Sequence, residues 1–418
     1  MRILFVLHQF FPEFAGGTER VALNMARMAQ HAGHHVQVLA STVNVEKSGG
    51  SSSDKAPQGC LELVYQGLPV TLIPTNLLPA TSDISMDASD EVVAGLADWI
   101  ASKCFDVAHV LHAMRMGSAL LALQRCDVPF VLSLTDFFLP CARINLITMR
   151  NKPCNGPDGG RLCQHNCPTV PWTSEAYVGR FEQAHSILKS AGARIAPSEY
   201  VAGRYREIFP DIDFQVIPHG VDLLAMTAQS EPVLAPLQPI NELHIVYVGT
   251  IIPQKGLDIL LRALALIPNA HVRLKVIGGL FGEPDYHEEI KRLASADDRV
   301  ELVGSMDGRQ VFQALRRAMV LCLPSVVPES FSLVLHESAA AGIPALVSNL
   351  GAPAELMQVH GCGRAVEAGD PQAWAAAIQE LVDVPETLNQ WKDNLFLPLR
   401  IEEEAFFLES VYQRLRCE

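Results

Sequence analysis

The sequence predicts an α/β protein built from two doubly wound domains. Short continuous apolar runs alternate with longer stretches of helical period, which is typical of parallel strands covered on both faces by helices. The alternation runs through both halves of the chain and is interrupted by a Pro-rich stretch between Val221 and Ile240. With 418 residues, the chain exceeds the roughly 250–300 residues at which single cores stop growing. We therefore expect two Rossmann-like domains that face each other across a ligand-binding cleft.

The first half of the chain is expected to form one sheet. Its strands are predicted at residues 2–8, 35–41, 61–67, 70–74, 107–112, 130–134, 193–198 and 214–218, and its helices at 18–31, 89–103, 116–125, 174–191 and 199–208. The helix at 18–31 shows the reasoning, because Val21, Met25 and Met28 share one face and Gly33 suits its end. The polar, Gly/Ser-rich tract at 47–59 is predicted to be a mobile surface loop outside the sheet.

The second half repeats the pattern and ends in an amphipathic helix. Strands are predicted at 244–249, 272–277, 300–304, 319–323 and 343–348, and helices at 255–267, 285–296, 308–317, 332–341 and 371–381. The predicted domains are residues 1–220 and 221–398, followed by a terminal helix at 399–418. The polar face of that helix holds four Glu against three Arg, which is a poor match to an anionic lipid surface.

Composition excludes several classes of protein. With 49% hydrophobic and 19% charged residues, the chain can bury a core and is not disordered. Its formal net charge of −14, without a basic run, argues against a nucleic-acid binder. No apolar run reaches the roughly 18–20 residues that span a bilayer, and no cleavage site follows the apolar start. Ten Cys in such a chain favour reduced thiols in a cytoplasm.

The segment at 321–349 holds the strongest chemical signal. An apolar strand ends near Pro324, a loop presents Glu329, and a helix begins near Ser332. Free peptide N–H groups at such a helix start, of Ser332 and Leu333, can bind a phosphate. On spacing alone, Glu329 and Glu337 are more simply interpreted as a helix-terminus carboxylate and a solvated face residue.

The context of this pair resembles a known family. Together with GIPALVSN and GAPAEL, the Glu-x7-Glu segment is similar to the retaining family-4 glycosyltransferases of the GT-B fold. IVYVGTIIPQKGLDILLRAL (245–264) looks like their KG signature, VIPHGVD (216–222) like the segment leading into it, and residues 8–36 like their Gly-Gly loop and first helix. In this fold the terminal helix commonly packs back on the N-terminal domain, and we expect the same here.

The resemblance implies a set of donor-binding residues. Glu329 would bind sugar hydroxyls near the reacting carbon, Glu337 the ribose hydroxyls, and Lys255 the diphosphate, with no metal needed for catalysis. The remaining expected donor-binding residues are Gly16, Gly17, Thr250, Gly278, Val303, Phe331, Ser332 and Leu333. Thr250 stands where the family usually has Arg, so Lys255 would carry more of the diphosphate charge. The Gly pair also fits a plain turn, and Lys255 an exposed first-turn lysine.

The acceptor side is expected at the ends of two strands of the first domain. His112 ends the strand VAHVLH, where carboxyl ends face the cleft, and Asp136 follows FVLSL, with Thr135 where many relatives have His. His112 is equally consistent with a hydrogen-bonded core histidine, and Asp136 with a cap of the following loop. His109 shares the strand face of His112 and should lie deeper.

Four cysteines follow Asp136 with the spacing C-x12-C-x8-C-x3-C: Cys141, Cys154, Cys163 and Cys167. A stretch of about 30 residues without periodicity needs something to stabilise it, and a structural zinc ion could do so. Reduced unpaired thiols or a chance disulfide are the alternative. The resemblance suggests that this Cys-rich insertion, residues 137–170, is an acceptor-side lid.

These observations favour a cytoplasmic, metal-independent, retaining glycosyltransferase, with at most peripheral contact with the inner face of the membrane. It would move a hexose-type sugar from a UDP or GDP sugar to a glycan or lipid-linked acceptor. Two other functions stay open: a nucleotide-cofactor oxidoreductase, which lacks G-x-G-x-x-G after either opening strand, and a non-catalytic nucleotide or glycan binder.

Overall fold

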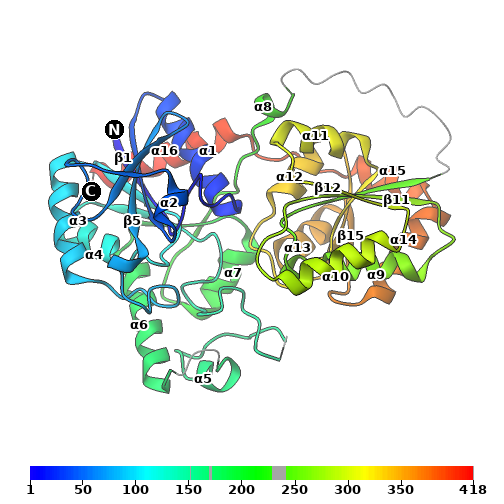
Figure 1. Cartoon of the computed structure of the whole chain (residues 1–418), viewed down its shortest axis with the longest axis horizontal. Coiled ribbons are helices and arrows are strands. Elements are labelled where there is room, and N and C mark those ends of the chain that lie inside the picture. The colour runs from blue at the N-terminus through cyan, green and yellow to red at the C-terminus, as the bar shows by residue number, and fades with distance from the viewer. Residues whose placement is uncertain (151, 169–171, 228–241, 418) are drawn as a thin grey trace. The chain divides into compact units, whose positions relative to one another are not determined.

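A computed structural model describes residues 1–150, 152–168, 172–227 and 242–417 (Figure 1). The chain forms two compact units. Unit 1 is Met1–His219 with Ile401–Glu418, and unit 2 is Gly220–Arg400. Each unit has its own sheet and its own apolar core. The α/β class expected from the sequence is confirmed.

Within the described residues, unit 1 contains a nine-stranded sheet in the order β3-β4-β5-β2-β1-β6-β7-β8-β9. The strands are β1 (Arg2–Val6), β2 (His35–Thr42), β3 (Ser51–Ser52), β4 (Leu61–Tyr65), β5 (Leu68–Pro74), β6 (Val107–Val110), β7 (Phe130–Ser133), β8 (Ala193–Ala196) and β9 (Gln215–Val216). All neighbours pair in parallel except β3 with β4 and β4 with β5. Residues 3–6 of β1 are fully buried, as expected for a central parallel strand covered on both faces.

The helices of unit 1 include the last helix of the chain. They are α1 (Gly17–His31), α2 (Val45–Ser48), η1 (Thr75–Leu77), α3 (Asp90–Lys103), α4 (Gly117–Arg125), α5 (Cys163–Asn166), α6 (Ser174–Ser190), α7 (Glu199–Ile208) and α16 (Ile401–Cys417). Helix α16 contacts α1, β6 and β7. Its Tyr412 hydroxyl lies 2.6 Å from Nδ1 of the fully buried His109, whose Nε2 lies 2.7 Å from the Ser133 hydroxyl.

The edge of this sheet departs from the prediction for the tract at 47–59. That tract was predicted as a loop outside the sheet, but α2 ends within it and β3 pairs antiparallel with β4, Ser51 opposite Glu62. The β3 side chains are exposed, so no apolar alternation marks them, and only backbone pairing at the edge defines the strand. Strands β4 and β5 are joined by a two-residue turn, Gln66 and Gly67. Both residues have positive φ, at 49° and 83°, as the common two-residue hairpin turns require.

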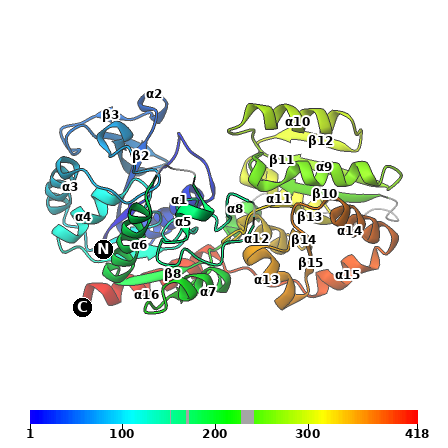
Figure 2. The same ribbon diagram turned by 90° about the horizontal axis from the view of Figure 1, so that it is seen from below.

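Unit 2 contains a six-stranded parallel sheet in the order β12-β11-β10-β13-β14-β15 within the described residues, and Figure 2 shows the strands in this order from top to bottom. The strands are β10 (Leu243–Val248), β11 (Val272–Ile277), β12 (Val300–Gly304), β13 (Val320–Leu323), β14 (Ala345–Ser348) and β15 (Gly363–Val366). Along β10, Ile245 and Tyr247 enter one core and Val246 the other, as the alternation of a strand requires.

Helices cover both faces of the unit 2 sheet. In Figure 1, α9 (Leu257–Leu266), α10 (Pro284–Ser295) and α14 (Pro371–Asp383) lie on one side, and α11 (Gly308–Arg317) and α12 (Leu333–Ala340) on the other. The remaining helices are α8 (Leu223–Thr227), η2 (Pro253–Lys255), α13 (Gly351–His360) and α15 (Glu386–Asp393). The sequence did not predict α8, α13, β15 or α15. Most of the predicted linker, residues 228–241, lies outside the described residues.

Candidate functional site

Strand order places one ligand-binding position in each unit. In unit 2 the chain passes from β10 to β11 on one side and later adds β13 on the other, so the order reverses between β10 and β13. In unit 1 it reverses between β1 and β6. Open α/β sheets bind ligands at the carboxyl ends of strands at such a reversal. The loops after these four strands are therefore the candidate sites.

The loop after β10 ends in Lys255 and Gly256, and backbone geometry explains the glycine. Gly256 has φ of 63°, and a Cβ on it would lie 2.0 Å from the carbonyl oxygen of Pro324, in the loop after β13. A left-handed conformation and this close approach both require glycine. The Gln254 carbonyl also accepts from the Val326 N–H at 3.0 Å. The two loops are thus joined tightly, and Lys255 is fixed at their junction.

Glu329 meets Lys255 in this junction. The Lys255 Nζ lies 2.9 Å from Glu329 Oε1, and the buried Ser325 hydroxyl donates to the same oxygen. The Glu329 backbone is held as well, because its carbonyl accepts from the Ala352 N–H at 2.9 Å. A Cβ on Gly351 would lie 2.4 Å from that carbonyl oxygen. Two residues 74 positions apart in the sequence are therefore brought into one charged pair.

The first turn of α12 follows Glu329 directly. Ser332 is its N-cap residue, and its side chain makes no capping hydrogen bond. Ser332 and Leu333 are the N-cap and first residue of this helix, so their peptide N–H groups have no acceptor within the helix, as in a phosphate-binding helix start. Phe331 stacks on the ring of His336, with centroids 4.0 Å apart. Glu337 is half-buried one turn further along the same helix.

Three other predicted donor residues lie at the ends of neighbouring strands. Gly278 follows β11, and a Cβ on it would lie 1.9 Å from the Gly249 carbonyl oxygen. Its N–H donates to the Gly304 carbonyl at 2.9 Å, so this N–H already has a partner within the sheet. Val303 packs partly buried against the core. Thr250 is exposed and supplies no positive charge.

In unit 1, His112 and Asp136 are brought together. His112 Nε2 lies 2.7 Å from Asp136 Oδ2, and its Nδ1 accepts from the Met114 N–H at 3.1 Å. The neutral ring therefore carries its proton on Nε2 and donates it to Asp136. Asp136 Oδ1 accepts from the Phe138 N–H at 2.8 Å, which is the capping role considered as the alternative. His112 is buried with both nitrogens used, so a ligand would meet the partly exposed Asp136 carboxylate instead.

Two buried residues in this region were not predicted. His8 follows β1, and its ring lies against that of His112 with centroids 4.0 Å apart. Its Nε2 lies 3.9 Å from Glu19 Oε1, near the start of α1, and neither His8 Nδ1 nor Glu19 Oε1 has a hydrogen-bond partner among the described residues. A Cβ on Gly16 would lie 2.5 Å from Glu19 Oε2, whereas a Cβ on Gly17 would meet nothing within 4 Å. Gly16 thus makes room for Glu19, and Gly17 borders open space.

Burial shifts the pKa values of this pair in opposite directions. Burial, with His112 and Arg115 nearby, lowers the pKa of His8 well below 6.5, and burial raises the pKa of Glu19 above 4.5. Both shifts favour the neutral form, as expected for ionisable groups removed from water.

The His8 shift predicts a pH-dependent stability. Below about pH 6.5 the unfolded chain binds a proton at residue 8 that the folded chain does not, so stability falls with decreasing pH by up to about 1.4 kcal/mol per pH unit. We expect the urea midpoint to fall less steeply between pH 7 and 5 in His8→Asn than in the parent. His271→Asn, at an exposed position, is the control. Equal slopes for His8→Asn and the parent would contradict the assignment.

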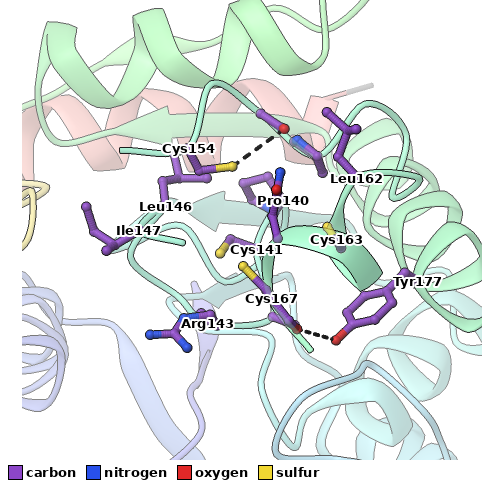
Figure 3. A pocket seen from close by; sticks show the side chains of 14 residues that line it. Pro140, Cys141, Arg143, Leu146, Ile147, Cys154, Leu162, Cys163, Cys167 and Tyr177 are labelled. Carbon is purple, nitrogen blue, oxygen red and sulfur yellow. Dashed lines mark hydrogen bonds between the residues drawn. The ribbon is translucent and has the colours of Figure 1, made fainter. Parts of the chain in front are cut away.

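The four cysteines of the 141–167 segment line a single pocket of about 20 Å³ (Figure 3). All four are free. Burial, together with Cys141 and the other pocket cysteines, raises the pKa of Cys163 to about 12. Among the described residues, no three His, Cys, Asp or Glu side chains are gathered closely enough to hold a metal ion as they stand. In the same part of the chain, no helix is both long and apolar enough to cross a membrane.

Two protein-family models match this chain. One, described as a glycosyl transferase 4-like domain, covers residues 16–220, and the other, described as glycosyl transferases group 1, covers residues 242–383. The D-inositol 3-phosphate glycosyltransferase of Xylanimonas cellulosilytica is 28% identical over 66% of this chain and 64% of its own length. This match therefore spans slightly less than two thirds of that protein.

Two further relatives match over more of their length. The phosphatidyl-myo-inositol mannosyltransferase of Mycolicibacterium smegmatis is 27% identical over 90% of this chain and 84% of its own length. The solved structure of HepE from Anabaena, in complex with UDP and glucose, matches with a TM-score of 0.68 and 18% identity over 99% of both chains. Two Rossmann-like units of this kind define the GT-B architecture. The chain belongs to the family-4 glycosyltransferases.

Proposed function

We propose that this protein transfers a hexose from a UDP or GDP sugar to a glycan or lipid-linked acceptor, with retention at the anomeric carbon and without a catalytic metal. The observation that carries the proposal is the Lys255–Glu329 pair, 2.9 Å apart, beside the first turn of α12. A cation, a carboxylate and free peptide N–H groups are the groups that a sugar diphosphate needs.

A bound donor would separate Lys255 from Glu329 and form a contact with each of them. Cleavage of the bond between sugar C1 and the diphosphate leaves negative charge on the phosphate oxygens, which the Lys255 ammonium and the N–H groups of Ser332 and Leu333 would stabilise. As Lys255 turns to the phosphate, the Glu329 carboxylate becomes available to accept hydrogen bonds from sugar hydroxyls. Glu337 would accept hydrogen bonds from the ribose. The departing phosphate would take the acceptor proton, so no protein nucleophile is required.

Asp136 is our candidate for the acceptor side. Its Oδ2 is oriented by the buried His112, and the carboxylate is partly exposed, so it can accept a hydrogen bond from an acceptor hydroxyl. The names of two relatives contain inositol 3-phosphate and phosphatidyl-myo-inositol. We therefore propose a polyol or glycan hydroxyl as the acceptor. We also propose that the protein is cytoplasmic, with at most peripheral membrane contact.

The test is thermal-shift screening with UDP, GDP and ADP sugars, because a ligand that binds only the folded state raises its stability. We expect a shift with one nucleotide class. In Glu337→Ala the shift should shrink and the donor KM should rise about tenfold, the effect of losing one hydrogen bond to a charged group. Turnover at saturating donor should stay close to the parent. Glu288→Ala, on the exposed face of α10, is the matched control.

Other outcomes would favour other functions. A shift with nicotinamide dinucleotides and none with nucleotide sugars would overturn the proposal in favour of an oxidoreductase. Donor binding without transfer to inositol phosphates, phosphatidylinositol or oligosaccharides would indicate a binder without turnover. The absence of Arg at Thr250 is the feature that motivates this last comparison.

A further inference from the structure

The pocket lined by the four cysteines lies in unit 1 and is formed mainly by the segment that connects β7 to α6 in the sequence. Cys141, Cys154, Cys163 and Cys167 come from three separate stretches of the segment, yet they surround one cavity of about 20 Å³. That volume is close to the roughly 10–15 Å³ that a single water-sized probe occupies, so the cavity has the size of one small ligand atom. In Figure 3 the sulfur atoms of Cys141 and Cys167 point toward each other.

A buried positive charge lies next to this pocket. The Arg180 guanidinium is 5% exposed and donates to the carbonyls of Ile84 at 2.6 Å, Leu139 at 2.8 Å and Phe138. Arg143, which lines the pocket, has a buried Nε without a hydrogen-bond partner. Within the described ranges neither arginine forms an ion pair with a carboxylate. Buried charges are normally paired, so the surroundings of the pocket favour a negatively charged group inside it.

We infer that the four cysteines bind one Zn²⁺ ion. Four thiols would lose four protons to solvent and form a tetrathiolate complex with a net charge of −2, which is the usual chemistry of a structural zinc site. That charge would compensate Arg180, and the Arg143 Nε–H could donate to a coordinated sulfur, as groups around a metal site commonly do. As described, the sulfurs do not meet at one point, so binding requires the side chains to turn inward.

Two disulfides could use the same four cysteines, but they would not compensate the buried charge of Arg180. Disulfide sulfurs carry no charge, so Arg180 would stay buried without a counter-charge. Two disulfides would also need an oxidant to accept four electrons, and none is present among the described residues of the 141–167 segment. The zinc complex requires only the ion and the release of protons.

The ion would stabilise the chain that follows Asp136. The Cys141 N–H donates to the Phe137 carbonyl at 2.9 Å, and Arg180 holds the carbonyls of residues 138 and 139. Zinc at Cys141 would therefore fix the loop in which Asp136 accepts from the Phe138 N–H. Removal of zinc should increase hydrogen exchange across residues 137–167 and leave unit 2 unchanged.

The experiment measures metal in the full chain, purified without chelator. We expect about one zinc per chain by elemental analysis, loss of that zinc in Cys141→Ser and Cys163→Ser, and retention in Cys104→Ser, at an exposed position outside the pocket. Cobalt added to the chelated protein should give the visible absorption of a tetrahedral thiolate site. These readouts do not depend on glycosyl transfer, so they are separate from the test of the proposed function.

Two results would overturn the inference. One is a folded parent protein without stoichiometric metal that takes up neither zinc nor cobalt after reduction. The other is an intact mass that shows two disulfides in protein purified under reducing conditions. If the serine variants fail to fold, zinc content and the cobalt spectrum of the parent protein still decide the question.

Discussion

Replacing Glu329 with Gln is expected to reduce turnover by about a hundredfold or more, because catalysis loses a preorganised charge at the reacting centre. Gln keeps the size of the side chain and can still accept from the Ser325 hydroxyl. It cannot hold a charge opposite Lys255, whose Nζ lies 2.9 Å from Glu329 Oε1, nor accept sugar hydroxyls as strongly as a carboxylate. The measurement is the initial rate of transfer at saturating donor and acceptor.

The fold should survive this substitution. The Lys255 side chain is 35% exposed, and pairs with an exposed partner contribute less than about 1 kcal/mol. Glu301→Gln is the matched control, since it breaks another Glu–Lys pair of unit 2, with Lys275 at 3.0 Å, away from the α12 start. We expect parent-like turnover from the control. Transfer by Glu329→Gln within a few-fold of the parent would show that Glu329 has no catalytic role.

The convergence of Lys255 and Glu329 could be expected from the sequence for a physical reason. Parallel strands end at the same edge of a sheet, so polar residues in the loops that follow two neighbouring strands can converge even when they are far apart in the chain. Lys255 and Glu329 each follow such a strand, β10 and β13, and these strands are neighbours. The sequence does not show which strands are neighbours in the sheet. The resemblance to a family supplied that order.

The pair His8 and Glu19 illustrates what the sequence could not provide. His8 ends the strand predicted at 2–8, and Glu19 lies in the helix predicted at 18–31, outside the apolar face of Val21, Met25 and Met28. Burial of Glu19 depends on Gly16, whose missing side chain leaves room for the carboxylate. The only signal available was a His at the carboxyl end of a strand, the same signal that identified His112.

Of the four edge strands, β9 and β12 were predicted, whereas β3 and β15 were not. Strand β3 has two exposed serines, and β15 has Gly363, where a Cβ would lie 2.1 Å from the Ala345 carbonyl oxygen. Both are defined by backbone contacts with a neighbour, which leave no periodic pattern of apolar side chains. Central strands such as β1 and β10 were predicted well because burial on both faces demands continuous apolar runs.

Replacing Gly256 with Ala is expected to cost unit 2 about 2–4 kcal/mol of stability, from a left-handed backbone and a forced overlap. The new Cβ would lie 2.0 Å from the Pro324 carbonyl oxygen, and a backbone atom cannot move aside as a flexible side chain can. Relief requires the loops after β10 and β13 to separate, which pulls Lys255 away from Glu329. Calorimetry of the full chain, with hydrogen exchange of unit 2 peptides, measures the loss.

Gly282→Ala separates the two causes of that loss. Gly282 has φ of 84°, but a Cβ on it would meet nothing within 4 Å, so this variant carries only the backbone cost of about 1–2 kcal/mol. If Gly256→Ala costs no more than Gly282→Ala, the loops can separate freely and the junction does not fix Lys255. If it costs more, and donor binding falls with it, the close approach of Gly256 to Pro324 is what holds the ammonium group opposite the carboxylate.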